Sequence, residues 1–162
     1  KIIDPVMVTR TGSKLLDDSA INAYKKFLLP IADLVTPNIY EANLLSDMKI
    51  KNKEEIEKAG KNILELGANA VLIKGGGLQD MKGKDFFIDK NGTRDWLVNE
   101  VINTKNTHGS GCTLSAAICA YRALGLELID SIKKAKLFVS KSLEYSYKIG
   151  SGPGPLGHCQ YL

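Results

Sequence analysis

The chain has 162 residues, of which 44% are hydrophobic and 25% charged, a composition typical of one globular domain with a hydrophobic core. Its formal charge of +4 comes from basic residues interspersed with acidic ones, and only 7% of its residues are aromatic, so no nucleic-acid-binding surface is indicated. No apolar run is long enough to span a membrane. We therefore predict a single domain, residues 1–162, whose partners are neither nucleic acid nor membrane.

In the first third of the chain, short apolar runs alternate with helical patterns. Residues 1–8 begin without a Met and predict a strand from the interior of a sheet, so the sequence is expected to start in mid-fold. Residues 17–19 cap a predicted helix. The apolar face of that helix consists of Ile21, Tyr24 and Leu28. A buried strand at 34–36 then leads to a short helix at 39–46.

The strongest helical pattern lies before Gly67, which is expected to end the helix. Asn52 followed by Glu55 predicts a capping box at its start. Its apolar stripe consists of Ile56, Ala59, Ile63 and Leu64.

The next segments predict strands of two kinds. Residues 70–74 are a continuous apolar run, typical of a central parallel strand whose carboxyl end opens onto a site. Residues 86–88 and 93–97 flank the turn Asn91-Gly92, so an antiparallel hairpin is expected and the sheet would be mixed. Strands that alternate with helices predict an α/β layered domain with a largely parallel central sheet.

The last third predicts two helices and a loop. Residues 110–124 are small or apolar nearly all round, as in a helix buried against a sheet. Residues 130–147 are amphipathic, and their lysines are expected on a solvated face. Residues 150–155 are rich in glycine and proline and predict either a flexible terminus, which is slightly favoured, or a wall of a nucleotide pocket.

Two glycines that bracket a serine make residues 103–117 the most informative run. Gly109 and Gly111 can aim consecutive N–H groups at one point, and the positive end of the following helix would add to their attraction for a phosphate or an oxyanion. Cys112 would lie on the first helical turn, where the same dipole lowers the pKa of a thiol. The alternative is an ordinary turn followed by an inert cysteine, and spacing alone gives the two interpretations about equal weight.

Three cysteines bear on the compartment of the chain. Cys112, Cys119 and Cys159 show neither metal-ligand spacing nor a paired framework. An odd number of thiols is typical of a reducing cytosol, so the chain is predicted to be cytoplasmic.

Four polar residues follow or end predicted strands: Asp4, Asn38, Glu41 and Lys74. Ligands bind at the carboxyl edge of an open α/β sheet, so we expect these side chains near a site. Carboxylates for a divalent cation, a lysine for phosphate charge and backbone donors for a transferred group together indicate phosphoryl transfer. Each residue also has a structural alternative: a turn at Asp4, a favourable helix start at Glu41 and a solvent-exposed Lys74.

Five segments carry a family resemblance along nearly the whole chain: Asp4-Pro5-Val6-Met7, Thr36-Pro37-Asn38-x-x-Glu41-Ala42, Ile73-Lys74-Gly75-Gly76, residues 103–117 and Gly152-x-Gly154-Pro155-Leu156. They resemble the ribokinase-like superfamily and, within it, the hydroxymethylpyrimidine/phosphomethylpyrimidine kinases of thiamine biosynthesis. The resemblance implies a ribokinase-like three-layer α/β fold without its N-terminal part. It also implies transfer from ATP, with Mg²⁺, to 4-amino-5-hydroxymethyl-2-methylpyrimidine and its monophosphate, and a homodimer.

The same resemblance implies roles for single residues. Gly109, Ser110 and Gly111 would form an anion hole for the transferred phosphoryl group, and Cys112 would lie beside the substrate hydroxyl as a late proton acceptor. Asp4 and Glu41 would bind Mg²⁺. The nucleotide would be contacted by Asn38, Lys74 and Thr104, with Asn38 also organising the metal's waters, and Val6 would line the pyrimidine pocket.

The chain departs from the family pattern at Tyr40, where a proline is usual, and at Gly77, where a histidine is common. Family members also carry an N-terminal portion that this sequence lacks. Two alternatives therefore stay open: a pyridoxal kinase of the same superfamily, and a non-catalytic nucleotide-binding fragment.

Overall fold

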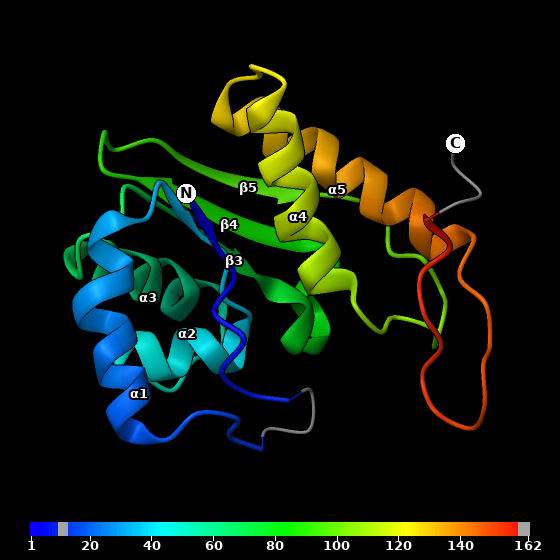
Figure 1. Cartoon of the computed structure of the whole chain (residues 1–162), viewed down its shortest axis with the longest axis horizontal. Coiled ribbons are helices and arrows are strands. Elements are labelled where there is room, and N and C mark those ends of the chain that lie inside the picture. The colour runs from blue at the N-terminus through cyan, green and yellow to red at the C-terminus, as the bar shows by residue number, and fades with distance from the viewer. Residues whose placement is uncertain (10–12, 159–162) are drawn as a thin grey trace. The chain divides into compact units, whose positions relative to one another are not determined.

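The computed structural model describes residues 1–9 and 13–158. A five-stranded mixed sheet forms the centre of its first compact unit, Lys1–Val98 (Figure 1). In spatial order the strands are β1 (Ile2–Ile3), β2 (Leu34–Val35), β3 (Ala70–Lys74), β4 (Lys84–Asp89) and β5 (Arg94–Val98). Strands β1, β2 and β3 run parallel, whereas β4 and β5 pair antiparallel. The parallel strands bring their carboxyl ends to one edge, so the residues that follow them become neighbours.

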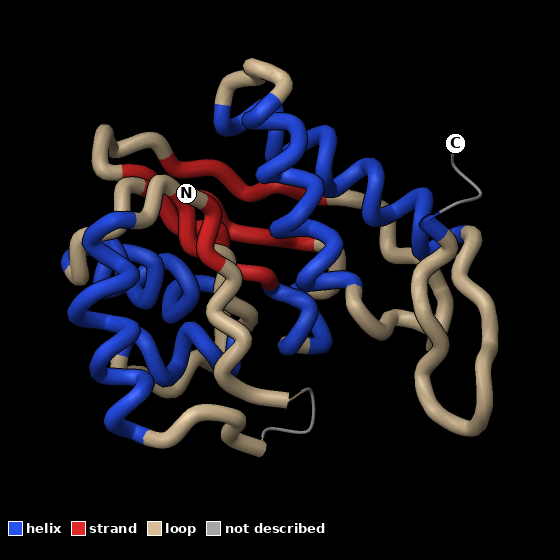
Figure 2. Tube along the Cα trace, viewed as in Figure 1, coloured by secondary structure: helices blue, strands red, loops and turns tan. Residues whose placement is uncertain are grey.

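The helices of this unit are α1 (Asp18–Ala23), α2 (Ile39–Ser46) and α3 (Lys53–Glu65) (Figure 2). α2 and α3 pack against each other and against β3, and α3 also contacts β4. The core between them is aliphatic, with Leu45, Ile56, Ile63 and Ile73 at most 1% exposed. The predicted strands at 34–36, 70–74 and around Asn91-Gly92, and the predicted helix at 39–46, are confirmed within one or two residues.

The apolar face of α1 differs from the prediction at one position. α1 continues into a π-helical turn (Tyr24–Leu28) and a 3₁₀ turn (Leu29–Ile31). Ile21 is 5% exposed and Leu29 is fully buried, whereas Leu28 is 39% exposed. A π turn holds one more residue per turn than an α turn, so the buried position moves from Leu28 to Leu29. The predicted N-cap is confirmed, because the Asp17 carboxylate accepts the Ala20 N–H at 2.7 Å.

The start of α3 has half of the predicted capping box. The Asn52 side chain accepts the Glu55 N–H at 2.9 Å, as expected. The Glu55 carboxylate, however, accepts the N–H of Lys51 rather than that of Asn52. The first bond satisfies an N–H group of the first turn of α3, and the second fixes the residue before the N-cap. Gly67 follows its end with φ of +107°, a conformation that glycine adopts at little cost.

The second compact unit, Asn99–Leu162, contains two helices that pack against each other, α4 (Ser110–Ala123) and α5 (Leu128–Glu144) (Figure 1). Burial of α4 nearly all round is a wrong prediction: Leu114, Ser115 and Ile118 are buried, but Cys119 is exposed. Most exposed positions of α4 carry small side chains, which leave little apolar area in water. In α5 the prediction that the lysines are solvated is wrong for Lys136, which is 7% exposed.

The glycine-rich segment after α5 is held in place rather than flexible at Gly154–Gly157. The Gly154 carbonyl accepts the His108 N–H at 3.1 Å, and the Gly154 N–H donates to Asn106 Oδ1 at 3.0 Å. Gly154 has no room for a side chain, because a Cβ there would lie 2.0 Å from the Tyr147 carbonyl oxygen. The favoured prediction of a flexible terminus is therefore wrong for this part of the segment. Cys159 lies outside the described residues.

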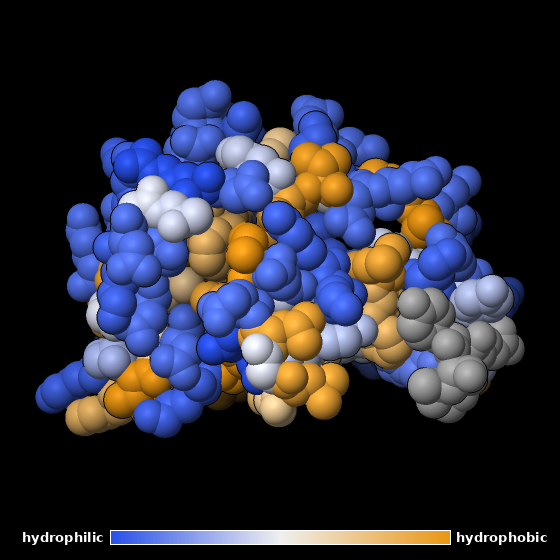
Figure 3. Space-filling model, turned by 90° about the horizontal axis from the view of Figure 1, so that it is seen from above, coloured by the Kyte–Doolittle hydropathy of each residue, from blue (hydrophilic) through white to orange (hydrophobic). Residues whose placement is uncertain are grey.

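Hydrophobic side chains also remain on the surface, as orange patches among hydrophilic residues show (Figure 3). Phe27 and Leu124 are 62% and 74% exposed. Among residues 1–9 and 13–158, no helix combines the length and the apolar character needed to cross a bilayer.

Candidate active site

The carboxyl edge of the parallel strands carries the residues predicted for phosphoryl transfer. Asp4 follows β1, Asn38 begins α2 shortly after β2, and Lys74 ends β3. A parallel bridge joins Asn38 to Lys74, and the Lys74 N–H donates to the Pro37 carbonyl oxygen at 2.8 Å. The backbone thus fixes these residues next to one another before any side chain contributes.

Lys74 forms an ion pair with Asp4. Its Nζ atom lies 3.1 Å from Asp4 Oδ1, and the two side chains are 15% and 16% exposed. The Thr36 hydroxyl donates to the same carboxylate oxygen at 3.4 Å. A charge pair so removed from water interacts more strongly than one on the surface, because solvent screens it less. The sequence-based alternative of a solvent-exposed Lys74 is therefore wrong.

Glu41 is 2% exposed and takes part in a complete capping box. Its carboxylate accepts the Asn38 N–H at 2.8 Å, while the Asn38 side chain accepts the Glu41 N–H at 2.9 Å. The predicted favourable helix start is confirmed, and the sequence had not indicated the reciprocal box. The cap itself does not exclude a second role, because a carboxylate offers about four lone-pair positions.

The charges around Glu41 act on its protonation. Burial raises the pKa of Glu41 above its ordinary value, and the negative charge of Asp4 adds to the rise. The bond from Asn38 and the positive charge of Lys74 oppose it. Asp4, Glu41 and Lys74 therefore form one electrostatic cluster, called here the carboxylate cluster.

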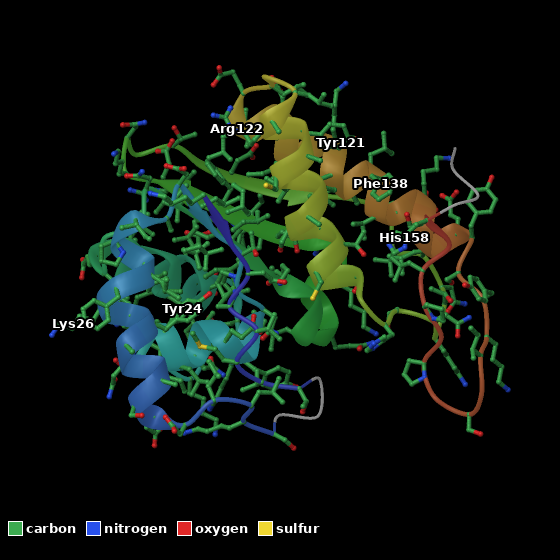
Figure 4. The ribbon with its side chains drawn as sticks, in the orientation of Figure 1. Tyr24, Lys26, Tyr121, Arg122, Phe138 and His158 are labelled. Carbon is green, nitrogen blue, oxygen red and sulfur yellow. The ribbon has the colours of Figure 1, made fainter. Side chains whose placement is uncertain are left out.

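Tyr24 is a further member of these surroundings that sequence reasoning missed. It lies at the start of the π turn after α1 (Figure 4) and packs against the core. Burial raises the pKa of Tyr24 far above its usual range, and the negative charges of Asp4 and Glu41 raise it further. Helical periodicity predicted Tyr24 on the apolar face of its helix, but no local signal could show that the charges of two carboxylates would act on it.

The carboxylate cluster fits a magnesium ion by the chemistry of its donors. Mg²⁺ is usually held by one or two carboxylates, together with phosphate oxygens and water, rather than by a cage of protein ligands. Asp4 and Glu41 supply two carboxylates that interact electrostatically. Within the described part of the chain, no cluster of three or more His, Cys, Asp or Glu side chains could hold a metal.

The second unit contains the predicted anion-binding turn at the start of α4. Gly109 is the N-cap residue with φ of +86°, and no side chain caps the helix there. A Cβ at Gly109 would have no heavy atom within 4 Å, so the backbone conformation, and not lack of space, favours glycine. Ser110 and Gly111 follow as the first helical residues, and Cys112 is exposed. Within this turn the Ser110 N–H donates to the Thr107 carbonyl oxygen at 3.3 Å, and anion binding by the turn stays a prediction.

The other predicted residues have varied positions. The Thr104 hydroxyl forms two hydrogen bonds within the second unit. It lies 3.0 Å from Ser146 Oγ, and it accepts the Asn106 N–H at 3.1 Å. Val6 is 49% exposed, and its N–H donates to the Asp4 carbonyl oxygen at 2.9 Å.

The two departures from the family pattern lie close to the carboxylate cluster in sequence. Tyr40 is 42% exposed in the first turn of α2. A Cβ at Gly77 would lie 3.0 Å from the Cβ of Ile39, so a side chain at position 77 would press on the start of α2. The absence of a histidine at Gly77 is consistent with this close approach.

Comparison with known proteins agrees with the predicted kinase family. The chain is 49% identical over 159 residues to a hydroxymethylpyrimidine/phosphomethylpyrimidine kinase of Synechococcus elongatus, which covers 98% of this chain and 60% of that protein. A Staphylococcus aureus protein of the same name is 42% identical over 163 residues, covering 99% of this chain and 59% of that protein. The chain thus spans about 60% of the length of these curated relatives.

Solved structures of two related kinases share the fold. Phosphomethylpyrimidine kinase from Clostridium difficile matches with a TM-score of 0.74 and 34% identity, over 88% of this chain and 56% of that one. Staphylococcus aureus pyridoxal kinase in complex with AMP-PCP and pyridoxal matches with a TM-score of 0.89 and 35% identity, over 99% and 57%. The predicted ribokinase-like α/β fold is confirmed. The family model for phosphomethylpyrimidine kinase matches residues 1–157, and the chain belongs to that family.

Proposed function

We propose that the chain is the nucleotide-binding part of an ATP-dependent kinase for 4-amino-5-hydroxymethyl-2-methylpyrimidine and its monophosphate. The observation that carries the proposal is the carboxylate cluster of Asp4, Glu41 and Lys74 at the edge of the parallel strands, in a chain of the phosphomethylpyrimidine kinase family. The product of the second transfer would be the pyrimidine diphosphate used in thiamine assembly.

In this proposal the carboxylate cluster serves the nucleotide phosphates. Asp4 and Glu41 would hold Mg²⁺, which neutralises charge on phosphate oxygens during transfer. Lys74 would donate to a phosphate oxygen while it keeps its ion pair with Asp4, since its ammonium group has three N–H donors. Asn38 and Thr104 would also contact the nucleotide, although both already hold local structure.

The turn at the start of α4 would receive the transferred phosphoryl group. The backbone N–H groups of Gly109, Ser110 and Gly111 would donate to its oxygens, aided by the helix dipole. Cys112 would accept the substrate proton late, because a loose transition state leaves the attacking hydroxyl protonated until the new O–P bond is well formed. Val6 would contact the pyrimidine ring.

A pyridoxal kinase is the second candidate, because a pyridoxal kinase structure matches this chain with a TM-score of 0.89. The curated relatives named above are hydroxymethylpyrimidine/phosphomethylpyrimidine kinases at 42% and 49% identity, so the pyrimidine is the better supported substrate. We also propose that the kinase is cytoplasmic and works as a homodimer, which size-exclusion chromatography with light scattering would test.

The decisive experiment measures ADP formation from ATP and Mg²⁺ with each of three acceptors: the hydroxymethylpyrimidine, its monophosphate and pyridoxal. Cys112→Ala is expected to lower kcat with little change in the KM for ATP. Cys119→Ala is the matched control, since it removes an exposed thiol two turns further along α4. Preference for pyridoxal would support the second candidate. ATP binding without transfer to any acceptor would contradict the kinase proposal for this chain and identify a non-catalytic nucleotide-binding fragment.

A further inference from the structure

The segment Gly154–His158 is seated on the loop that precedes α4. Besides the contacts of Gly154 with Asn106 and His108, the Gly157 N–H donates to the Ser142 carbonyl oxygen of α5 at 2.9 Å. A Cβ at Gly157 would lie 2.2 Å from the Tyr145 carbonyl oxygen, so this residue is as closely packed as Gly154. The backbone therefore delivers the next residue, His158, to a defined position.

His158 contacts both helices of its unit (Figure 4). Its Nε2 atom lies 2.9 Å from the Thr113 hydroxyl on α4. Its ring stacks on Phe138 of α5, with 6.2 Å between ring centres and 13° between planes. One contact fixes where the nitrogen points and the other fixes the plane of the ring.

Thr113 closes the turn that contains the predicted anion hole. Its N–H donates to the Gly109 carbonyl oxygen at 2.9 Å, so the bonded loop encloses Ser110, Gly111 and Cys112. A threonine hydroxyl within a helix often bonds the carbonyl four residues earlier and bends the helix, whereas that of Thr113 contacts His158. The side chain of Thr113 thus anchors the turn from outside the helix.

We propose that His158 is a positioning residue for the turn Gly109–Cys112, acting through the Thr113 hydroxyl. The proposal rests on the proposed function in one respect, namely that this turn receives the transferred phosphoryl group. His158 itself touches neither substrate nor nucleotide. It holds the backbone donors of the turn and the Cys112 thiol in the orientation that transfer requires, since small misplacements of donors lower rates strongly.

The test uses the full chain with Cys119→Ser and Cys159→Ser, so that alkylation by iodoacetamide reports on Cys112. His158→Ala and Thr113→Val are each expected to change the alkylation rate of Cys112 by roughly five- to tenfold, the scale of one hydrogen bond. The alkylation rate of Cys112 in the double variant should equal the rate in either single variant, because both substitutions remove the same hydrogen bond. His158→Gln, which keeps a side-chain hydrogen-bonding group, should restore most of the wild-type rate. Ser140→Ala is the matched control, because it removes a hydrogen bond of similar kind, to Asn99, elsewhere in the same unit.

Kinase assays on the same variants separate positioning from a general structural role. His158→Ala should lower kcat roughly five- to tenfold while the KM for ATP stays within about twofold, and thermal melting should show that it is folded. Unchanged alkylation in both single variants, or additive effects in the double variant, would overturn the proposal. If His158→Ala does not fold, Thr113→Val decides alone. If His158→Ala and Thr113→Val change the alkylation rate of Cys112 non-additively but the chain shows no kinase activity, the contact between His158 and Thr113 still positions the turn. The proposed function would then be rejected.

Discussion

Lys74 and Asp4 are 70 residues apart in sequence, yet their side chains meet at 3.1 Å where two parallel strands end. Burial raises the pKa of Glu41, and the positive charge of Lys74 opposes that rise. One lysine therefore offsets the negative charge of two carboxylates within the carboxylate cluster, and its removal should affect both.

Breaking the Lys74–Asp4 pair should destabilise the chain. Lys74→Met leaves Asp4 with a partly buried, uncompensated charge, which should cost about 2–4 kcal/mol of unfolding free energy in urea denaturation. Adding Asp4→Asn should recover much of the loss, because the stranded charge disappears. Lys25→Met is the control, since its partner Asp47 is 84% exposed and water can solvate it. Strictly additive losses for Lys74→Met and Asp4→Asn would argue against coupling.

Glu41→Gln should stabilise the chain near neutral pH while weakening activity. The pKa of Glu41 is raised in the folded state, so folding favours its protonated form. That advantage is complete below the ordinary value of 4.5 and is lost as the pH rises through the folded-state pKa. Glutamine keeps an oxygen for the Asn38 N–H without carrying charge.

The measurement for Glu41→Gln is urea denaturation from pH 4 to pH 8. The unfolding free energy of the wild type should fall relative to the variant as the pH rises. Glu55→Gln is the control, because it removes a carboxylate from the first turn of another helix, α3, and shows how that loss alone changes the unfolding free energy. A difference between wild type and Glu41→Gln that does not vary with pH would contradict the expectation.

Tyr24 should ionise far above the usual tyrosine value of about 10. Its pKa is raised because it is partly buried and because the negative charges of Asp4 and Glu41 act on it. Up to about pH 11 Tyr24 should therefore stay protonated and contribute nothing to the absorbance change at 295 nm that ionising tyrosines produce. The wild type and Tyr24→Phe should then show the same change, and free tyrosine gives the change expected for one phenol. Because the folded state holds this proton more tightly, the unfolding free energy should fall above about pH 10 by ~1.4 kcal/mol per pH unit relative to Tyr24→Phe. If the absorbance change near pH 10 were smaller in Tyr24→Phe than in the wild type by the amount of one phenol, Tyr24 would ionise at the usual pH and the expectation would be refuted.

Gly109→Ala and Gly125→Ala form a matched pair at the two ends of α4. Both glycines have positive φ, +86° and +89°, and a Cβ at either would have no atom within 4 Å. Each substitution should cost about 1–2 kcal/mol of unfolding free energy, because only the backbone conformation is penalised. Only Gly109→Ala should also lower kcat, since it alters the turn proposed to receive phosphate. Equal kcat in the two variants would remove Gly109 from the proposed site.

Much of the local structure follows from patterns that the sequence contains. The helix at 39–46, the cap at Asn52 and the turn at Gly92 depend on neighbours within a few residues, so spacing and side-chain chemistry determine them. The glycine turn before α4 is of the same kind, because its positive φ excludes most residues other than glycine. The family motifs lie on these local elements, so the sequence could also indicate the family.

Tertiary structure alone decided how distant residues meet. Burial and long-range pairing placed Tyr24 near Asp4 and Glu41 and joined Lys74 to Asp4. It also seated Gly154 on the loop before α4, where the composition of residues 150–155 had favoured a flexible end. The physical reason is that the free energy of these contacts depends on which segments pack together, and periodicity within one segment carries no information about its partner.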